Sequence, residues 1–246
     1  MPMRSNYLMA MPLALLLAGS TAGAQTRFYG EDNTGSESTR ATNVNALAAR
    51  NSFLSNLIGV GTETFESRSG SAPLALTFPG AGTATLNGTG GVAAEAGATN
   101  GFGRYPTSGT NFWEATLTRS ATFRVTFSDY VAAFGFYAID LGDFGSNLSL
   151  QFYKDGNLID SWSPYNTSFS SCPNIYCGGL KFIGSINSTT FNEVRFLGSS
   201  NDDVFAFDDM TVGSLEQVSV PEPGSFALVA AGLVGLGAVA RRRRQS

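Results

Sequence analysis

The stretch Ala121-Thr-Phe-Arg-Val-Thr-Phe127, followed by Val131-Ala-Ala-Phe-Gly-Phe-Tyr-Ala-Ile139, decides the fold class. In its first half Phe123, Val125 and Phe127 alternate with polar residues. A period of two is typical of a β-strand with one buried face and one wet face. The second half predicts another strand of high apolar content.

Apolar stretches of the same kind recur further along the chain, separated by Gly, Pro, Asn and Ser. The turn Asp155-Gly-Asn157 predicts a hairpin between two of them. Because no helix intervenes between these strands, we expect an antiparallel, jelly-roll-like β-sandwich over residues 63–215. The expected strands cover residues 74–78, 83–86, 112–116, 121–127, 131–139, 147–153, 158–162, 180–183, 191–197 and 204–212.

One amphipathic helix is expected ahead of the strands, within residues 41–58, as part of an N-terminal region 25–62. Its apolar residues recur at helical spacing, and neither Pro nor Gly intervenes before Gly59. The preceding polar segment, residues 25–40, is left open between a strand and a flexible arm. The expected apolar face consists of Val44, Leu47, Ala48, Leu54 and Ile58, widened by Phe53 and Leu57.

Composition excludes several kinds of chemistry. The 246 residues are 43% apolar and 14% charged, with 29 Gly and no His. A soluble domain usually carries about 25% charged residues, so this chain is charge-poor. Without an imidazole there is no Ser-His-Asp triad, no Cys-His dyad and no His-ligated zinc.

The N-terminus has the organisation of a secretory signal peptide, residues 1–24. A single cation, Arg4, precedes an apolar stretch at residues 8–18, which is too short to span a bilayer. The small residues Ala22-Gly23-Ala24 follow, so cleavage is expected between Ala24 and Gln25.

The C-terminus carries a three-part tail within residues 216–246: Val220-Pro221-Glu222-Pro223-Gly224, an apolar segment at 225–240, and the cluster Arg241-Arg242-Arg243-Arg244. Sixteen residues at about 1.5 Å each make roughly 24 Å of helix, slightly less than a hydrocarbon core of about 30 Å. The segment can still span if the bilayer thins around it. The Arg cluster places the cytoplasmic end, so we expect this helix in the inner membrane with the body on the far side.

These residues resemble the PEP-CTERM sorting signal of exopolysaccharide-producing Gram-negative bacteria. The resemblance implies that a membrane-embedded exosortase recognises the tail, removes it, and passes the protein to the cell surface or to the extracellular biofilm matrix. It implies a destination and a transient partner, and it leaves the role of the body open.

The exported part is acidic. Removing both terminal segments takes five Arg and one Glu from the 15 basic and 19 acidic residues, which leaves a net charge of −8. Such a surface repels phosphates, so nucleic acid is not an expected partner.

Two cysteines, Cys172 and Cys177, enclose four residues. In an exported protein, an even count at close spacing predicts a disulfide that closes a small surface loop. A metal site there would need two further ligands, and the chain has no His to supply them.

Two acidic groups offer the best chance of site chemistry, Asp140 with Asp143, and Asp202, Asp203, Asp208 and Asp209. Carboxylate oxygens suit calcium, which is abundant outside the cytoplasm. Adjacent residues of one strand point to opposite faces, so only one of Asp208 and Asp209 is expected to face a given site.

The motifs Thr64-Phe65-Glu66, Phe134-Gly-Phe-Tyr-Ala-Ile-Asp140 and Phe207-Asp-Asp-Met-Thr-Val212 resemble the jelly-roll ectodomains of PEP-CTERM proteins and calcium-containing carbohydrate-binding modules. The resemblance implies a structural calcium shared by Glu66 and either Asp208 or Asp209. A turn or cap role for the same carboxylates, and a catalytic one, stay open beside it.

The expected function is non-catalytic: the body binds or organises extracellular polysaccharide. Sugar recognition needs exposed aromatic rings and a few polar partners, and Trp113, Trp162 and Tyr165 are the candidates. The alternative for each Trp is a place in the core.

Two other functions stay open. A glycan hydrolase needs only two carboxylates, about 5–5.5 Å or 6.5–9.5 Å apart. Glu66, Glu114, Asp140 and Glu193 could supply them, but their spacing selects no pair. The third possibility is a structural adhesin or matrix protein that assembles through sheet edges and has no specific glycan ligand.

Overall fold

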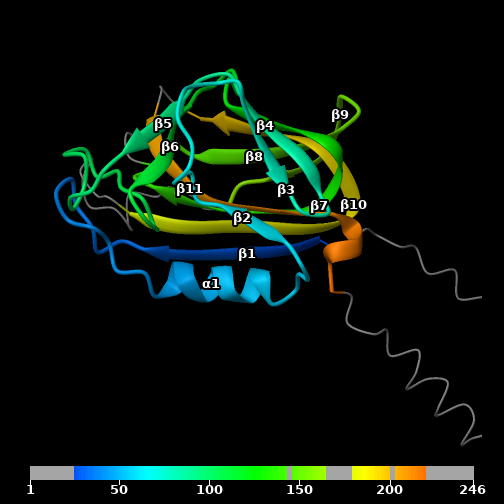
Figure 1. The fold of residues 1–246 in the computed structure, drawn as a ribbon, viewed down its shortest axis with the longest axis horizontal. Helices are drawn as coiled ribbons and strands as arrows, with labels where there is room; N and C mark the ends of the chain where they lie inside the picture. Colours follow the sequence, from blue (N-terminus) through cyan, green and yellow to red (C-terminus); the bar gives the residue numbers. More distant parts are fainter. Residues whose placement is uncertain (1–24, 143–145, 165–178, 200–202, 220–246) are drawn as a thin grey trace, which may run out of the picture.

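The computed structural model describes residues 25–142, 146–164, 179–199 and 203–219. Within them the chain forms strands with one α-helix and one short 3-10 helix (Figure 1). The expected signal peptide, the segment with Cys172, Cys177 and Tyr165, and the tail from residue 220 lie outside the described residues. The elements are β1 (Gln25–Asp32), α1 (Asn45–Leu54), β2 (Gly61–Glu63), β3 (Leu74–Phe78), β4 (Gly82–Asn87), β5 (Gly91–Ala94), β6 (Asn111–Leu117), β7 (Arg124–Ile139), β8 (Leu148–Lys154), β9 (Asn157–Trp162), β10 (Leu180–Gly198), β11 (Asp203–Gly213) and η2 (Leu215–Gln217).

The strands form one open antiparallel sheet. Its main order is β5-β6-β11-β7-β10-β8-β9, with β1 on β10, β2 on β11, and β3 on β4, which pairs with β7. The predicted mainly-β architecture with one helix is confirmed. The sheets of the expected sandwich are not separate, because all eleven described strands are hydrogen-bonded into one network.

Two long strands explain this continuity. The predicted strands 121–127 and 131–139 are halves of β7, and 180–183 and 191–197 are halves of β10. The first half of β7 pairs with β4 and the second half with β10 and β11. Likewise β10 pairs first with β1 and β7 and then, after a register shift, with β8. Figure 1 shows the result, with β4 and β8 lying above the layer of β1, β10 and β11.

The main core lies between these two layers and consists largely of Phe. Phe136 stacks on Phe207 at 4.8 Å between ring centroids, and Phe123 lies 4.6 Å from Phe196. All four rings are completely buried. A buried Phe contributes about 2–3 kcal/mol, so this cluster dominates the stability of the sheet.

A second core cluster lies under α1. Gly135 of β7 and Gly184 of β10 are paired in register, and the ring of Phe53 packs over both. A Cβ on Gly135 would lie 2.8 Å from that ring, and one on Gly184 would lie 3.0 Å from it. The two glycines therefore form the floor on which the helix rests.

The helix differs from its expected form. It is shorter than residues 41–58, and it buries Ala46 and Phe53. The expected apolar face is largely exposed, with 66% of Val44, 40% of Leu47 and 65% of Ile58 accessible. The helix carries apolar residues on two sides, and the glycine floor selects the side that presents Phe53. The period alone therefore could not identify the buried face.

The segment 25–40, which the sequence left open between a strand and a flexible arm, begins with the strand β1. This strand pairs with β10 along its whole length. Its last residue, Asp32, accepts hydrogen bonds from the backbone N–H groups of Val44, Asn45 and Ala46 at 3.0, 3.1 and 2.9 Å. A carboxylate from β1 thus caps the first turn of α1.

The free edges of the two layers meet at Arg27 of β1. Its guanidinium pairs with Asp160 of β9 and lies over the rings of Phe152 and Trp162, at 5.2 and 5.0 Å from their centroids. It also donates to the Ser185 hydroxyl of β10. One side chain therefore joins the edge strand of one layer to the edge strand of the other.

The predicted β8–β9 hairpin is confirmed. Lys154 pairs with Asn157, and the two residues between them, Asp155 and Gly156, have φ of 51° and 79°. Positive φ at both central positions is the type I′ geometry that an Asp-Gly turn favours. The hairpin places Asp155 beside the bend of β7, where one of the surface depressions lies.

Candidate functional site

The last strand holds the loop of residues 106–111 through two acidic side chains. Asp208 accepts hydrogen bonds at Oδ2 from the backbone N and the hydroxyl of Thr107, both at 2.7 Å. Asp209 accepts one from the hydroxyl of Ser108, at 2.8 Å between Oγ and Oδ1. The expectation that only one of the two could face a given site is wrong. A register shift follows Asp208, and Asp209 has a φ of 48°, so strict alternation fails there.

Glu66 holds the other end of this loop. Its Oε1 accepts from the backbone N–H groups of Thr110 and Asn111 at 2.8 and 2.7 Å. Gly109 has a φ of 61°, and a Cβ there would lie 2.2 Å from the Glu66 carboxyl carbon. The three residues proposed as calcium ligands therefore bind the same loop.

The two ends of the loop differ in electrostatics. Asp208 is completely buried, and burial, with the charge of Asp209 as a second cause, raises the pKa of Asp208 to about 7. Glu66 is exposed, and the hydrogen bond from the Asn111 backbone lowers the pKa of Glu66. The buried end is thus sensitive to protonation near neutral pH, while the exposed end is ionised there.

The metal expectation stays a prediction. Among the described residues, no group of three or more His, Cys, Asp or Glu is placed so that it could hold a metal ion. Glu66, Asp208 and Asp209 thus do not make such a group, and each of them accepts hydrogen bonds from the loop of residues 106–111. Asp143 and Asp202 lie outside the described residues.

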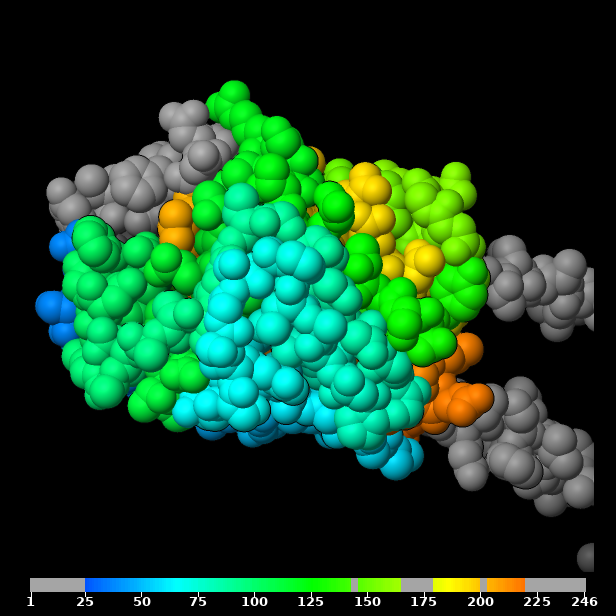
Figure 2. Space-filling view, turned by 45° about the horizontal axis from the view of Figure 1, so that its top comes forward, coloured from blue at the N-terminus to red at the C-terminus, as the bar shows by residue number. Residues whose placement is uncertain are grey.

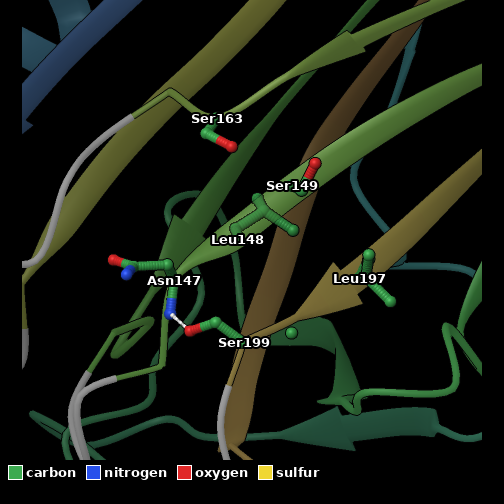
Figure 3. Close-up of a pocket in the computed structure, with 7 residues that line it drawn as sticks. Asn147, Leu148, Ser149, Ser163, Leu197 and Ser199 are labelled. Carbon is green, nitrogen blue, oxygen red and sulfur yellow. Dashed lines mark hydrogen bonds between the residues drawn. The ribbon is translucent and has the colours of Figure 1, made fainter.

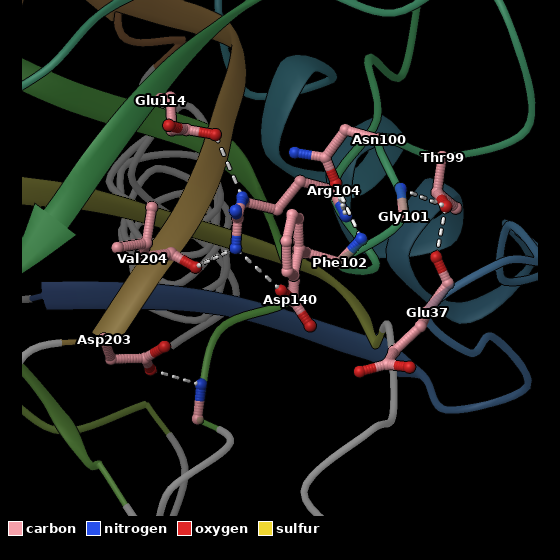
Figure 4. A network of polar contacts seen from close by, with 11 residues as sticks. Glu37, Thr99, Asn100, Gly101, Phe102, Arg104, Glu114, Asp140, Asp203 and Val204 are labelled. Carbon is pink, nitrogen blue, oxygen red and sulfur yellow. Dashed lines mark hydrogen bonds and ion pairs between the residues drawn. The ribbon is translucent and has the colours of Figure 1, made fainter.

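Arg104 connects two of the acidic residues considered for hydrolysis (Figure 4). Its Nε donates to Glu114 Oε2 at 3.0 Å, and its Nη1 donates to Asp140 Oδ2 at 3.3 Å and to the Val204 carbonyl oxygen at 3.3 Å. The guanidinium also lies over the ring of Phe102, 5.4 Å from its centroid. Both carboxylates are thus paired with one cation at the ends of three strands.

The three aromatic residues expected to bind sugar lie in different environments. Trp113 is completely buried, with its ring 6.4 Å from that of Phe65, so it presents no ring face to solvent. Trp162 is half-buried under the guanidinium of Arg27. Tyr165 lies outside the described residues. Of the three, Trp162 alone is seen at a surface, and it serves there to join two sheet edges.

A small hollow of about 110 Å³ lies where β8 begins and β10 ends (Figure 3). Asn147 and Ser199 exchange hydrogen bonds at its rim, with 2.8 Å from the Asn147 backbone N to the Ser199 hydroxyl. Ser149 and Ser163 add hydroxyl groups, and Leu197 contributes an apolar wall. The hollow is smaller than a second surface depression, which lies elsewhere on the described part of the chain.

The larger depression, of about 210 Å³, is lined by Ser128, Asp129, Tyr130 and Asn192. We call it the Tyr130 depression. It forms where β7 bends between its halves and where β10 resumes after its register shift. Tyr130 is 48% exposed, and its lining offers hydroxyl, carboxylate, phenol and amide groups.

The β8–β9 hairpin supports this depression from the side. The hydroxyl of Tyr130 donates to the Asp155 carboxylate at 2.9 Å, and Asn192 Nδ2 donates to Asp155 Oδ1 at 3.2 Å. The ammonium of Lys154 lies 4.9 Å from the centre of the Tyr130 ring. The hydrogen bond to Asp155 raises the pKa of Tyr130, so the phenol stays protonated at neutral pH.

Sequence reasoning missed the Tyr130 depression. Its residues stand between two stretches interpreted as separate strands, where Ser128-Asp129-Tyr130 has the composition of an ordinary turn. The sequence offers one signal for this site: an aromatic residue, Tyr130, stands between two polar residues and the start of an apolar strand. The contribution of Asn192 depends on a pairing across 62 residues, which no local pattern indicates.

The comparisons with known proteins concern the C-terminus. Residues 219–244 match the PEP-CTERM protein-sorting motif. The predicted sorting signal is therefore confirmed, and the chain is an exported protein that exosortase processes. No curated protein matches the chain.

The described part of the chain contains no helix that is long and apolar enough to cross a membrane.

Proposed function

We propose that the exported body is a non-catalytic surface or matrix protein that binds or organises extracellular polysaccharide. The observation that carries this proposal is the Tyr130 depression. It offers a half-exposed aromatic ring beside a carboxylate, an amide and a hydroxyl within one small hollow. A sugar ring needs an apolar platform for its C–H face and polar partners for its hydroxyl groups, and this set supplies both.

The pairing of the other carboxylates favours binding over hydrolysis. Glu114 and Asp140 share Arg104, and Glu66 is occupied by its loop. Glu193 lies between two arginines, 2.7 Å from Arg195 Nε and 3.8 Å from Arg124 Nε. A hydrolase needs two carboxyl groups that face the scissile bond, whereas these carboxylates are engaged by arginines or by backbone N–H groups of the protein itself. Two alternatives to the proposed function are a glycan hydrolase and an adhesin without a glycan ligand.

The experiment is a binding assay of the exosortase-processed protein on the polysaccharide of the organism that produces it. We expect the wild type to bind, and Tyr130→Ala to bind about tenfold more weakly, which is the loss of about 1.4 kcal/mol of stacking and hydrogen bonding. The matched control is Phe102→Ala, because Phe102 is also an exposed aromatic residue and is 63% accessible. This control is expected to bind as the wild type does.

Three results would contradict the proposal. Equal binding by Tyr130→Ala and wild type would remove the depression from the mechanism. Wild type that binds no glycan would favour the adhesin. Release of shorter sugars, abolished by replacing one carboxylate, would establish the hydrolase.

We also infer the route of the protein to its destination. Residues 1–24 direct export, the segment 225–240 holds the chain in the inner membrane, and exosortase then releases the body to the cell surface or matrix. The order of the segments along the chain supports this route, with the expected signal peptide first, the body second and the sorting tail last. The folded-over sheet, in which β7 and β10 serve both layers, supports a jelly-roll-like body.

Calcium remains part of the proposal in a narrower form. Asp208 and Asp209 are the carboxylates that would hold it, because the two acidic side chains approach the same loop from adjacent positions of β11. We expect added calcium to raise the melting temperature of the wild type and to leave that of Asp208→Asn unchanged. Equal responses of the two proteins to calcium and to a chelator would refute the site.

A further inference from the structure

The described chain is fixed to the body up to the start of the sorting motif. The backbone N of Ser219 donates to the Asn56 carbonyl oxygen at 2.8 Å, and the backbone N of Ile58 donates to that of Gln217 at 2.8 Å. The side chain of Gln217 donates to the carbonyl oxygen of Gly59 at 2.7 Å. The motif therefore starts from a defined point beside the C-terminal end of α1. Figure 2 shows the orange residues that lead to this point at one end of the molecule.

The distance from this point to the membrane is limited by chain length. Five residues, 220–224, separate Ser219 from the apolar segment 225–240. Fully extended, five residues reach no more than about 18 Å. While that segment is held in the bilayer, the surface around Ser219 must lie within this reach of the lipid.

The surface around Ser219 carries exposed apolar side chains and few charges. Ile58 is 65% exposed and Leu215 is 48% exposed, and both lie within a few residues of the contacts that fix Ser219. Along residues 41–60 the one charged residue is Arg50, which is half-buried, and Glu216 is the exposed charge of η2. The outward face of α1 continues this surface with the exposed Val44 and Leu47. In an acidic body, a face with few charges and exposed apolar side chains at the attachment point suits contact with lipid.

We propose that in the membrane-anchored precursor this surface lies on the outer side of the bilayer that holds the tail, with Ile58 and Leu215 at the level of the lipid headgroups. The contact orients the body and holds Pro221-Glu222-Pro223 at the membrane surface, where a membrane-embedded protease can reach it. Two side chains bury too little apolar area to retain a protein without its anchor. Removal of the tail therefore releases the body.

The test uses the full-length precursor in liposomes of phosphatidylethanolamine and phosphatidylglycerol, with the exosortase-processed protein in the same buffer as reference. Hydroxyl-radical labelling of side chains is read by mass spectrometry. We expect labelling of Ile58 and Leu215 to fall severalfold in the liposomes relative to the processed protein. Leu158 of β9, which is 52% exposed, is the matched internal control and is expected to label equally in both.

A variant pair checks that the apolar side chains cause the contact. The double variant Ile58→Gln with Leu215→Gln removes them without adding charge. Liposomes should also protect the exposed Leu47 of α1 in the wild type, and we expect the double variant to lose this protection. The control variant Leu158→Gln is expected to keep it. Equal labelling of Ile58 in precursor and processed protein would overturn the proposal. Protection that is present in the processed protein and grows with its concentration would instead indicate a second copy of the chain on this face.

Discussion

At the scale of single residues, Asp208 is held at an electrostatic cost, because burial and the charge of Asp209 disfavour its ionised form. It is completely buried and adjacent to a second carboxylate, yet it holds Thr107 through two short hydrogen bonds. The bonds favour the ionised form, whereas burial and Asp209 favour the protonated form more strongly. The loop at 106–111 is therefore attached to the body through a group that titrates near neutrality.

Asp208→Asn should change how stability depends on pH. The pKa of Asp208 is about 7 in the folded protein and 3.8 in an ordinary Asp, so its stabilising contribution is complete below the lower value and is lost as pH rises through about 7. We expect the wild type to lose stability relative to the variant between pH 5 and pH 8, with a slope approaching about 1.4 kcal/mol per pH unit at most. Urea denaturation in calcium-free buffer at several pH values measures it.

The control for this experiment is Glu216→Gln, which removes an exposed carboxylate of η2 and whose stability curve should run parallel to that of the wild type. Parallel stability curves for wild type and Asp208→Asn would show that Asp208 titrates normally.

The sequence indicated which acidic residues belong to the candidate site, but it did not indicate which contacts they make. Glu66, Asp208 and Asp209 were selected from short motifs, and the structure brings all three to one loop. The local pattern did not reveal the backbone shift at Asp209 that turns both acids toward it. Trp113 illustrates the reverse problem, because nothing in its neighbours distinguishes a buried ring from an exposed one.

At the scale of elements, the fit of the Phe53 ring on two glycines attaches α1 to the sheet. The spacing of the apolar residues in the helix does not determine which face packs. The ring of Phe53 requires two paired glycines beneath it, and Asp32 supplies acceptors for the first turn. Each feature can be removed on its own.

Gly184→Ala should destabilise the protein by about 1–3 kcal/mol, because the new methyl group overpacks the ring of Phe53. Phe53→Leu should also destabilise it, by loss of the ring. The double variant should be more stable than the sum of the two effects predicts, since the smaller side chain leaves room for the methyl group. Thermal and urea unfolding of the four proteins give the coupling energy. Strict additivity would mean that the ring and the glycine do not press on each other.

Asp32→Ala should cost about 1–2 kcal/mol, since it leaves the first backbone N–H groups of α1 without their acceptor. The loss should be local, so amide hydrogen exchange of residues 45–49 should accelerate more than that of the central strands. Asp32→Asn keeps one acceptor oxygen and should lie between the two. Uniform acceleration across the sheet would contradict a capping role.

Element type could be predicted from the sequence, and element continuity could not. Strand β3 and the β8–β9 hairpin match their expected positions, because alternation and turn chemistry are local. The joined strands β7 and β10 were divided, because an exposed polar interval within a strand resembles a turn. Strand β5 was missed because it is short and lies in a glycine-rich stretch.

At the scale of the whole molecule, Arg27 closes a sheet that hydrogen bonding leaves open. It joins β1 to β9 across 133 residues of chain. Its side chain is 20% exposed and that of Asp160 is 11% exposed, so the pair is largely shielded from water. Removing one partner of such a pair leaves the other charge buried and unpaired, which costs more than the loss of a surface ion pair.

Arg27→Met should lower stability by about 2–3 kcal/mol, since Asp160 would lose its cation while it stays largely buried and two rings would lose theirs. The matched control is Arg124→Met. Arg124 is 47% exposed and 3.8 Å from Glu193, so its removal should cost less than about 0.5 kcal/mol. Urea unfolding of both variants measures the two losses of stability. Equal losses would show that the pair of Arg27 and Asp160 contributes no more than a surface ion pair.

The destination of the protein could be predicted from the sequence because a sorting signal is linear. Its three parts follow one another within the tail, and the match to the motif at 219–244 confirms them. The closure by Arg27 depends on contacts between distant segments, and these emerge only from the folded chain.

The attachment of the tail to β11 has a mechanical consequence. This strand is hydrogen-bonded to β7 on one edge and to β6 and β2 on the other, and it leads through η2 to Ser219. Tension on the anchor is therefore transmitted along the axis of a central strand, so its ladders are loaded in shear and many bonds must break together. A pull on the C-terminus would therefore meet the hydrogen bonds of several strands at once, so the body is expected to stay folded while its tail is held.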